Sequence, residues 1–234
     1  MSYKIQDNLT LIKARIRAAA LRANRDPARV RLIAASKTVS CDGIREAVAA
    51  GITAFGENYI QEARSKIESV GRTDISWHLI GHLQTNKAKY AVRLFDMIHS
   101  IDSLNLAREV DKRAGKEKKV LPVLIQVNIA GEASKSGICP ADAISLVREI
   151  ATLENLSVRG LMTMPPYFNE PEKVRPYFRE LKNLQAIIRK EKIPAIRMEE
   201  LSMGMTGDFE AAVEEGATMV RIGTAVFGVR MQVR

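Results

Sequence analysis

The chain has 234 residues, of which 46% are hydrophobic and 27% are charged, and its formal net charge is +9. This composition is typical of a folded protein with a large buried core and excludes an intrinsically disordered chain. Two cysteines, Cys41 and Cys139, are too few for a disulfide framework or a cysteine-rich zinc site. The longest apolar stretches, about ten residues each, are too short to cross a bilayer, so we expect no membrane association.

The first predicted element is an amphipathic helix within residues 1–23, where apolar residues recur at helical spacing. This segment lacks the charged start and the following apolar block of a signal peptide. We therefore expect an extra helix ahead of the main fold and a cytoplasmic protein, which the scarcity of cysteine also suits.

From residue 30 onward, short β-branched or apolar runs alternate with longer stretches of helical period. The runs predict eight strands, at residues 30–39, 53–58, 76–81, 96–102, 121–129, 157–164, 197–203 and 218–228.

Boundary signals mark the helices between these strands. Gly51 and Gly71 are placed where helices end, and Pro140 is placed just inside a helix start. Pro176 lies near the beginning of the longest candidate helix, so we expect that helix to start late or to kink. Asp208 is expected in a first turn, where the helix dipole favours a carboxylate. The helices are predicted within residues 41–51, 58–71, 84–95, 103–115, 140–153, 171–190 and 206–216.

Strands joined by helical crossovers are parallel, and parallel strands are covered on both faces, which explains the nearly continuous apolar runs. Eight such units favour a single closed (β/α)8 TIM-type barrel, in the α/β class, that fills residues 1–234 as one domain. The alternative is an open doubly wound sheet. The absence of GxGxxG after the first strand weakens its dinucleotide-binding form.

A parallel barrel carries its active site at the carboxyl ends of its strands, and this rule selects Lys37 after the first strand. Lysine is depleted in strands and is rarely buried without a partner. In the barrel mouth its amine could act as a nucleophile. The alternative is a lysine at the edge of the barrel that reaches into solvent.

The last two strands end in hydroxyl and glycine residues. Ser202 closes strand seven next to Met203, and Gly223 and Thr224 close strand eight, where Arg221 alternates with apolar neighbours. Loops after strands seven and eight often bind phosphate in this fold, and helix starts offer N–H groups to anions. We therefore expect a phosphate site here, with ordinary tight turns as the alternative.

Other functions find less support in the sequence. His78 and His82 are four residues apart, but no third ligand is evident, so we expect no metal site. His99, inside strand four, is interpreted as a structural histidine. Basic residues are interspersed with acidic ones, and no basic-aromatic strip is present, so we expect no nucleic acid partner despite the net charge.

A lysine, a phosphate site and a barrel together suggest pyridoxal 5′-phosphate (PLP), which bonds its aldehyde to a lysine amine. The ring nitrogen of PLP then needs a partner. An arginine is a permanent cation with donors only, so Arg221 would keep that nitrogen unprotonated. Such a site is a weak electron sink, suited to carrying the cofactor or to limited proton chemistry.

Long segments of the chain resemble the pyridoxal phosphate homeostasis proteins, which are similar to the N-terminal barrel of alanine racemase and belong to fold type III. The resemblance covers essentially the whole chain. Its motifs are ASKTVS (35–40), FGENYIQEA (55–63), WHLIGHLQTNKAKY (77–90), NIAGEASKSGI (128–138), GLMTMPP (160–166) and LSMGMTGDFEAAVEEGATMVRIGTAVFG (201–228).

The resemblance implies roles for individual residues. Lys37 would form the Schiff base with PLP, and Arg221 would face the pyridine nitrogen. Ser202, Gly223 and Thr224 would hold the phosphate, and Asn58, His82 and Met203 would line the surroundings of the cofactor.

Family members are thought to bind PLP and hand it to apo-enzymes, which keeps free aldehyde low, without strong catalytic activity. The alternative is a PLP-dependent amino-acid racemase of low rate. This chain is expected to lack the second domain that supplies the opposite base in alanine racemase, unless Tyr59, Tyr90 or Tyr167 substitutes for it. An open barrel mouth is compatible with a monomer.

Overall fold

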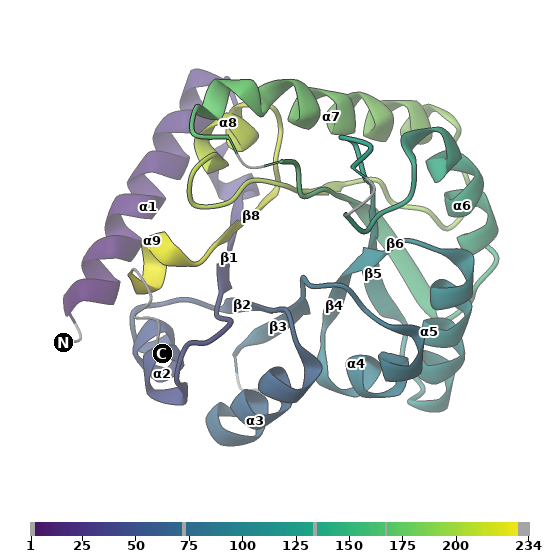
Figure 1. Cartoon of the computed structure of the whole chain (residues 1–234), viewed down its shortest axis with the longest axis horizontal. Coiled ribbons are helices and arrows are strands. Elements are labelled where there is room, and N and C mark those ends of the chain that lie inside the picture. Colours follow the sequence, from purple (N-terminus) through teal and green to yellow (C-terminus); the bar gives the residue numbers. More distant parts are fainter. Residues whose placement is uncertain (1–2, 72–73, 133–134, 167, 229–234) are drawn as a thin grey trace.

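The computed structural model describes residues 3–71, 74–132, 135–166 and 168–228. Eight parallel strands form a closed barrel in which each strand pairs with the next and β8 pairs with β1 (Figure 1). The strands are β1 (Arg31–Ala35), β2 (Ala54–Glu57), β3 (Ser76–Leu79), β4 (Met97–Ile101), β5 (Leu121–Gln126), β6 (Leu156–Met162), β7 (Glu200–Ser202) and β8 (Met219–Ile222).

Helices surround the barrel on its outside (Figure 1). The α-helices are α1 (Tyr3–Arg22), α2 (Cys41–Ala49), α3 (Ile60–Val70), α4 (Ala88–Leu94), α5 (Leu104–Lys116), α6 (Ala143–Ile150), α7 (Arg175–Lys190), α8 (Phe209–Glu214) and α9 (Thr224–Phe227). Four 3-10 turns precede or follow them: η1 (Pro27–Arg29), η2 (Thr85–Lys87), η3 (Pro140–Asp142) and η4 (Pro171–Lys173).

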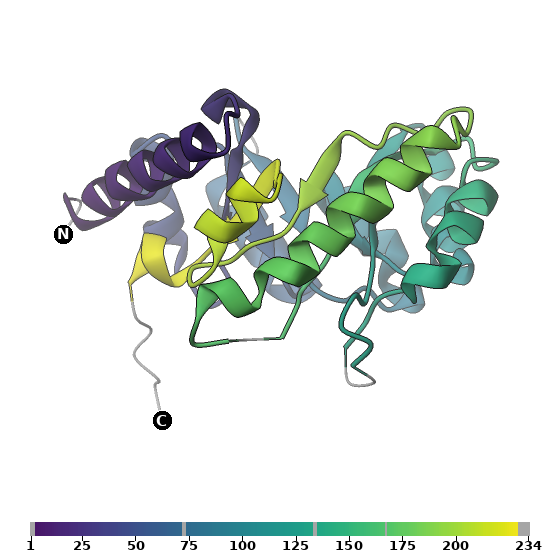
Figure 2. The same cartoon turned by 90° about the horizontal axis from the view of Figure 1, so that it is seen from above.

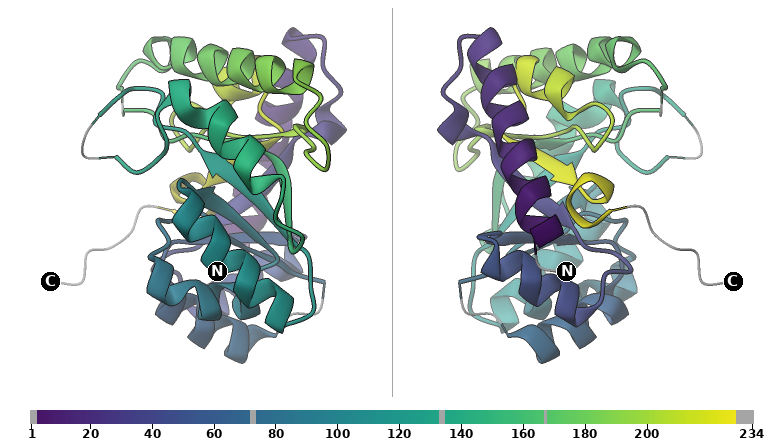
Figure 3. Two further views of the ribbon diagram at one scale, coloured as in Figure 1. Left: turned by 90° about the vertical axis from the view of Figure 1, so that its right-hand side faces the viewer. Right: turned by 90° about the vertical axis from the view of Figure 1, so that its left-hand side faces the viewer.

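The predicted fold class is confirmed: the chain forms a (β/α)8 barrel with an extra helix, α1, at its start. Figures 2 and 3 show α1 crossing the outside of the barrel beside α8 and α9. Arg15 forms an ion pair with Glu210, and Arg22 forms one with Glu214, so both ion pairs tie α1 to α8. None of the described helices is both long and apolar enough to span a membrane.

All eight strands end earlier than predicted, and the first and the eighth differ most. The first ends at Ala35, so Lys37 lies in the turn that follows. The eighth ends at Ile222, and Gly223 is the N-cap of the short helix α9. The helix predicted within residues 171–190 starts late, as expected, because its first residues form η4. Pro176 then falls in the first turn of α7, where a missing N–H costs nothing.

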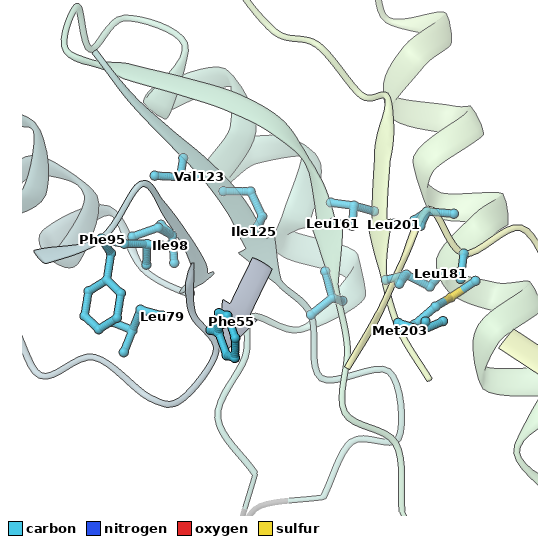
Figure 4. Packing of buried hydrophobic residues seen from close by; sticks show 14 of the residues in the cluster. Phe55, Leu79, Phe95, Ile98, Val123, Ile125, Leu161, Leu181, Leu201 and Met203 are labelled. Atoms are coloured by element: carbon cyan, nitrogen blue, oxygen red, sulfur yellow. The ribbon is translucent and has the colours of Figure 1, made fainter. Parts of the chain in front are cut away.

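The main core lies between the strands and the helices. Figure 4 shows part of it, where Leu201 and Met203 lie beside Leu181 of α7. Since side chains alternate along a strand, every second residue points into the barrel instead. A smaller apolar cluster of Ile33, Met97, Leu124, Met162 and Met219 is separate from the main core.

Gly160 of β6 lies against the backbone of Glu200 in β7. An added Cβ would lie 1.9 Å from the backbone oxygen of Glu200, an atom that cannot move without shifting β7. We expect Gly160→Ala to lower the free energy of unfolding by about 2 kcal/mol through overpacking. Urea denaturation of the purified variant measures this loss.

Gly51→Ala is the matched control for Gly160→Ala. Gly51 has a φ of +90°, and a Cβ there would meet no atom within 4 Å, so only backbone strain of about 1 kcal/mol opposes alanine. Equal losses for the two variants would contradict the close-approach explanation.

Candidate functional site

A cavity of about 300 Å³ opens at the carboxyl ends of the barrel strands. We call it the mouth cavity. It is lined by Ala35, Lys37, Asn58, Ile80, Met164, Phe168, Met205, Thr206, Gly207, Asp208, Arg221, Gly223 and Thr224.

Lys37 reaches the mouth cavity because of where β1 stops. Ile33, Ala35 and Lys37 alternate along the strand and its extension, so all three belong to the face that points into the barrel. Lys37 is half-buried in the wall of the cavity. The mouth cavity therefore contains a primary amine near its rim.

Two loops form another part of the wall. The loop between β7 and α8 contributes Thr206 and Gly207, and the turn from β8 into α9 contributes Gly223 and Thr224. The hydroxyl of Thr206 accepts a hydrogen bond from the backbone N–H of Ala225 at 3.4 Å, which ties the two loops together. Hydroxyls and backbone N–H groups of this kind suit an anion.

Asp208 is the one carboxylate among the described residues that line the mouth cavity. Its Oδ1 accepts a hydrogen bond from the backbone N–H of Met205 at 2.5 Å, which closes the loop before α8. Burial raises the pKa of Asp208, while this backbone hydrogen bond and the charge of Arg221 lower it. Asp208 thus stabilises the loop that carries Thr206.

Arg221 forms the floor of the mouth cavity and is only 3% exposed. Its guanidinium donates to Ser202 Oγ at 2.6 Å and to the backbone oxygen of Thr163 at 2.8 Å. Burial lowers its pKa to about 10, so it remains a cation at neutral pH. Two of its five N–H donors are used by these contacts. A buried cation at the floor of a cavity favours a ligand with an acceptor atom or negative charge.

A chain of hydrogen bonds continues from Arg221 through the inside of the barrel. Ser202 Oγ lies 2.9 Å from Nδ1 of His99, His99 Nε2 lies 2.8 Å from Nδ1 of His78, and His78 Nε2 lies 2.9 Å from Oγ of Ser76. Both imidazoles are buried. Burial lowers the pKa of His78 to about 4 and lowers that of His99 well below its usual value, so both rings are neutral.

Five of the eight residues predicted for the site line the mouth cavity: Lys37, Asn58, Arg221, Gly223 and Thr224. The other three lie elsewhere. Ser202 is fully buried beneath the cavity, and its hydroxyl bonds to Arg221 and His99. Met203 packs in the main core (Figure 4).

His82 lies in the wall of a neighbouring cavity of about 390 Å³, which we call the side cavity. Its Nδ1 is 3.8 Å from a carboxylate oxygen of Asp102. Asn58 lines both cavities and so separates them. The side cavity is lined by Asn58, Tyr59, Ile60, Gln61, Gly81, His82, Leu83, Gln84 and Lys87.

Sequence reasoning did not select Thr206, Gly207 and Asp208 as site residues, although they lie in the segment it considered. Thr206-Gly207 is a second hydroxyl-glycine pair, four residues beyond Ser202. It belongs to the loop after strand seven, where this fold often binds phosphate, and that signal could have identified it.

The chemical groups that line the mouth cavity match the groups of PLP. A primary amine, a buried cation and a wall of hydroxyl and N–H groups match an aldehyde, a ring nitrogen and a phosphate. Apolar side chains of Ile80, Met164, Phe168 and Met205 offer faces for a ring. Among the described residues, no group of three or more His, Cys, Asp or Glu is placed to hold a metal ion.

The fold and the mouth cavity define a (β/α)8-barrel protein with a lysine-bearing ligand site at the carboxyl ends of its strands. Residues 8–231 match the family described as alanine racemase, N-terminal domain. The pyridoxal phosphate homeostasis protein of Aquifex aeolicus is 46% identical over 224 residues, which cover 96% of this chain and 97% of that one. The protein of that name in Escherichia coli K12 is 43% identical, with 97% of each chain covered.

Solved structures agree with these relatives. PipY of Synechococcus elongatus PCC7942, solved with PLP bound, has a TM-score of 0.82 and 38% identity, with 96% of this chain and 100% of PipY covered. The chain belongs to the pyridoxal phosphate homeostasis protein family.

Proposed function

We propose that this protein binds PLP in the mouth cavity, holds it as a Schiff base on Lys37, and acts in PLP homeostasis inside the cell by releasing it to apo-enzymes. In this proposal it is a single-domain carrier without strong catalytic activity. One observation carries the proposal: a single cavity combines the amine of Lys37, the buried cation of Arg221 and the donor wall around Thr206 and Thr224.

Each residue has a task set by its chemistry. When bound, PLP supplies an aldehyde that condenses reversibly with an amine. The amine nitrogen of Lys37 would take the place of the aldehyde oxygen in a C=N bond, and that oxygen would leave as water with two amine hydrogens. Arg221 donates a hydrogen bond toward the ring nitrogen, and Thr206, Gly223 and Thr224 bind the phosphate. Ser202 contributes by holding Arg221 in place.

Binding by relatives supports the ligand. PipY has been solved with PLP bound, and the curated relatives are named for PLP homeostasis. The openness of the cavity to solvent suits reversible loading and release, because water must enter to hydrolyse the C=N bond.

Lys37→Ala tests the attachment point. We expect the wild-type protein to turn yellow with PLP and to retain one reduced adduct, mapped by mass spectrometry to the peptide with Lys37, after borohydride treatment. Lys37→Ala should retain none, since no other lysine lines the mouth cavity among the described residues.

Lys87→Ala is the matched control, because Lys87 lines the side cavity only. Its adduct should equal that of the wild type. A stoichiometric adduct in Lys37→Ala would overturn the proposal. Exchange of amino-acid α-protons for deuterium would instead favour the racemase alternative, for which Tyr59 and Tyr90 lie outside the mouth cavity wall and Tyr167 lies outside the described residues.

A further inference from the structure

A buried ionic network lies beside the turn that carries Lys37. At its centre is Lys66 of α3, which is only 4% exposed. Its Nζ donates to the backbone oxygen of Ser36 at 2.5 Å, to Glu57 Oε1 at 2.8 Å and to Glu62 Oε1 at 2.6 Å. These three contacts use all three donors of the ammonium group. Lys66 is therefore held by one backbone carbonyl and two carboxylates.

The network holds the chain on both sides of Lys37. On one side, Ser36 donates its hydroxyl to Glu57 Oε1 at 2.6 Å and offers its carbonyl to Lys66. On the other side, the backbone N–H of Thr38 donates to Glu62 Oε1. The two residues that flank Lys37 are thus fixed by side chains from the end of β2 and from α3.

Thr38 has a φ of +62°, in the left-handed region that β-branched residues avoid. Such backbone strain persists only where surrounding contacts enforce it, and it concentrates at functional sites. Two contacts hold it here: the hydrogen bond from Thr38 to Glu62, and the backbone hydrogen bond from the N–H of Val39 to the oxygen of Ser36 at 3.0 Å, which closes the turn. The conformation at Thr38 sets the direction in which the chain leaves Lys37.

Burying the charged groups of this network costs free energy of folding, and a merely structural contact would not require that cost. It places two carboxylates against a single ammonium group, with Glu57 fully buried and Glu62 26% exposed, and Glu57 Oε2 has no hydrogen-bond partner among the described residues. Burial raises the pKa of Glu57, although the hydrogen bonds from Lys66 and Ser36 oppose that rise. Apolar residues of similar volume often stabilise a fold as well as a buried ion pair does. What this network provides, and apolar residues would not, is a fixed geometry for the turn that carries Lys37.

We propose that Glu57, Glu62 and Lys66 are positioning residues for Lys37, which hold its turn in the strained conformation that directs the amine at the PLP aldehyde. This inference rests on the proposed function. The carboxylate of Glu62 and the ammonium of Lys66 do not touch the ligand in this proposal; they act through the peptide groups of Ser36 and Thr38.

Glu62→Ala and Glu62→Gln test the proposal in the full-length protein. Glu62→Ala removes the acceptor of the Thr38 N–H, so the rate of covalent attachment of PLP should fall at least about tenfold through misplacement of the amine. Glu62→Gln keeps an acceptor oxygen and should recover most of that loss. The rate is followed by the absorbance of the bound ligand and by borohydride trapping.

Pyridoxine 5′-phosphate separates positioning from collapse of the cavity, because it carries the same ring and phosphate but an alcohol in place of the aldehyde. Its affinity for Glu62→Ala should stay within about twofold of that for the wild type. Equal losses for PLP attachment and for pyridoxine 5′-phosphate affinity would overturn the inference.

A second variant uses the strain at Thr38. Glycine adopts positive φ without cost, so Thr38→Gly should partly restore the attachment rate when added to Glu62→Ala. Glu68→Ala is the control on the same helix, since Glu68 forms an exposed pair with Arg64. It should leave the rate unchanged.

The failure of this inference differs from the failure of the proposed function. If the wild type attaches PLP at Lys37 and Glu62→Ala attaches it equally fast, the positioning roles are wrong and the proposed function stands. If the wild type forms no adduct at Lys37, the proposed function itself fails.

Discussion

The contribution of His78 and His99 to the free energy of unfolding is expected to fall by about 3 kcal/mol when the pH falls from 6.5 to 4. In the unfolded chain, His78 takes up a proton near pH 6.5, whereas burial lowers its pKa in the folded protein to about 4. Between these values the unfolded state binds more protons, so stability falls as pH falls. The gap corresponds to about 3 kcal/mol for His78 at ~1.4 kcal/mol per pH unit, and the lowered pKa of His99 adds a loss of the same sign.

Chemical denaturation at a series of pH values measures this effect. The charges that act on the histidine pair are those of Arg31 and Arg221, which lower the pKa values, and Asp96, which raises that of His78. Replacing both histidines by glutamine should flatten the profile between pH 6.5 and pH 4.

His82→Gln is the control for this double variant. Its side chain is 54% exposed and lies outside the buried pair, so the variant should keep the wild-type profile. A double variant with an unchanged slope would contradict the assignment of the acid loss to the buried pair.

The alternation of apolar runs and helical stretches predicted the barrel because parallel strands covered on both faces leave a strong signal in the sequence. All eight predicted strands exist. The ends were less predictable. Gly223-Thr224 continues an apolar run, yet Val226 and Phe227 form helical hydrogen bonds to Gly223. Whether a strand continues or a helix begins at Gly223 depends on local hydrogen bonding, and the pattern of hydrophobic residues does not reveal it.

The rule that sites lie at the carboxyl ends of strands selected Lys37, Arg221 and Gly223, and all three line one cavity. The rule did not distinguish a residue that lines the cavity from a residue just beneath it. Ser202 and Thr206 are both hydroxyls near the end of β7, but only Thr206 reaches the cavity wall. That distinction depends on the path of the loop after β7.

The interior hydrogen-bond chain could not be predicted either. His78 and His99 come from β3 and β4, and the sequence pattern relates His78 to His82 by spacing and indicates a structural role for His99, without pairing the two. Their pairing follows from the inward alternation of neighbouring strands and from the register between β3 and β4. Ser202 joins them from the opposite part of the barrel, 103 positions further along the chain than His99.

Arg221→Met is expected to weaken PLP binding by about tenfold or more while changing the stability of the ligand-free protein by only about 1 kcal/mol. Loss of a charge-assisted hydrogen bond to a ligand costs about 1.5 to 3 kcal/mol of binding. The stability change is small because two effects oppose each other. The variant loses the hydrogen bonds to Ser202 and Thr163, but it also removes a buried cation whose pKa of about 10 records the cost of its burial.

Arg25→Met is the matched control. Arg25 is also partly buried, burial also lowers its pKa, and it donates to the backbone oxygens of Val213 and Ala217, away from the mouth cavity. This variant should lose stability and keep the affinity for PLP. The affinity of each ligand-free protein for PLP and for pyridoxine 5′-phosphate, with urea denaturation of the same samples, measures both effects.

Arg221→Met also tests whether the ligand site influences the loss of stability at low pH. The charge of Arg221 is one cause of the lowered pKa of His99, so its removal should raise that pKa and reduce the loss of stability between pH 6.5 and pH 4. Arg25→Met should leave the acid profile unchanged. If both arginine variants bind PLP like the wild type, Arg221 does not contact the ligand, and the orientation proposed for PLP in the mouth cavity is wrong.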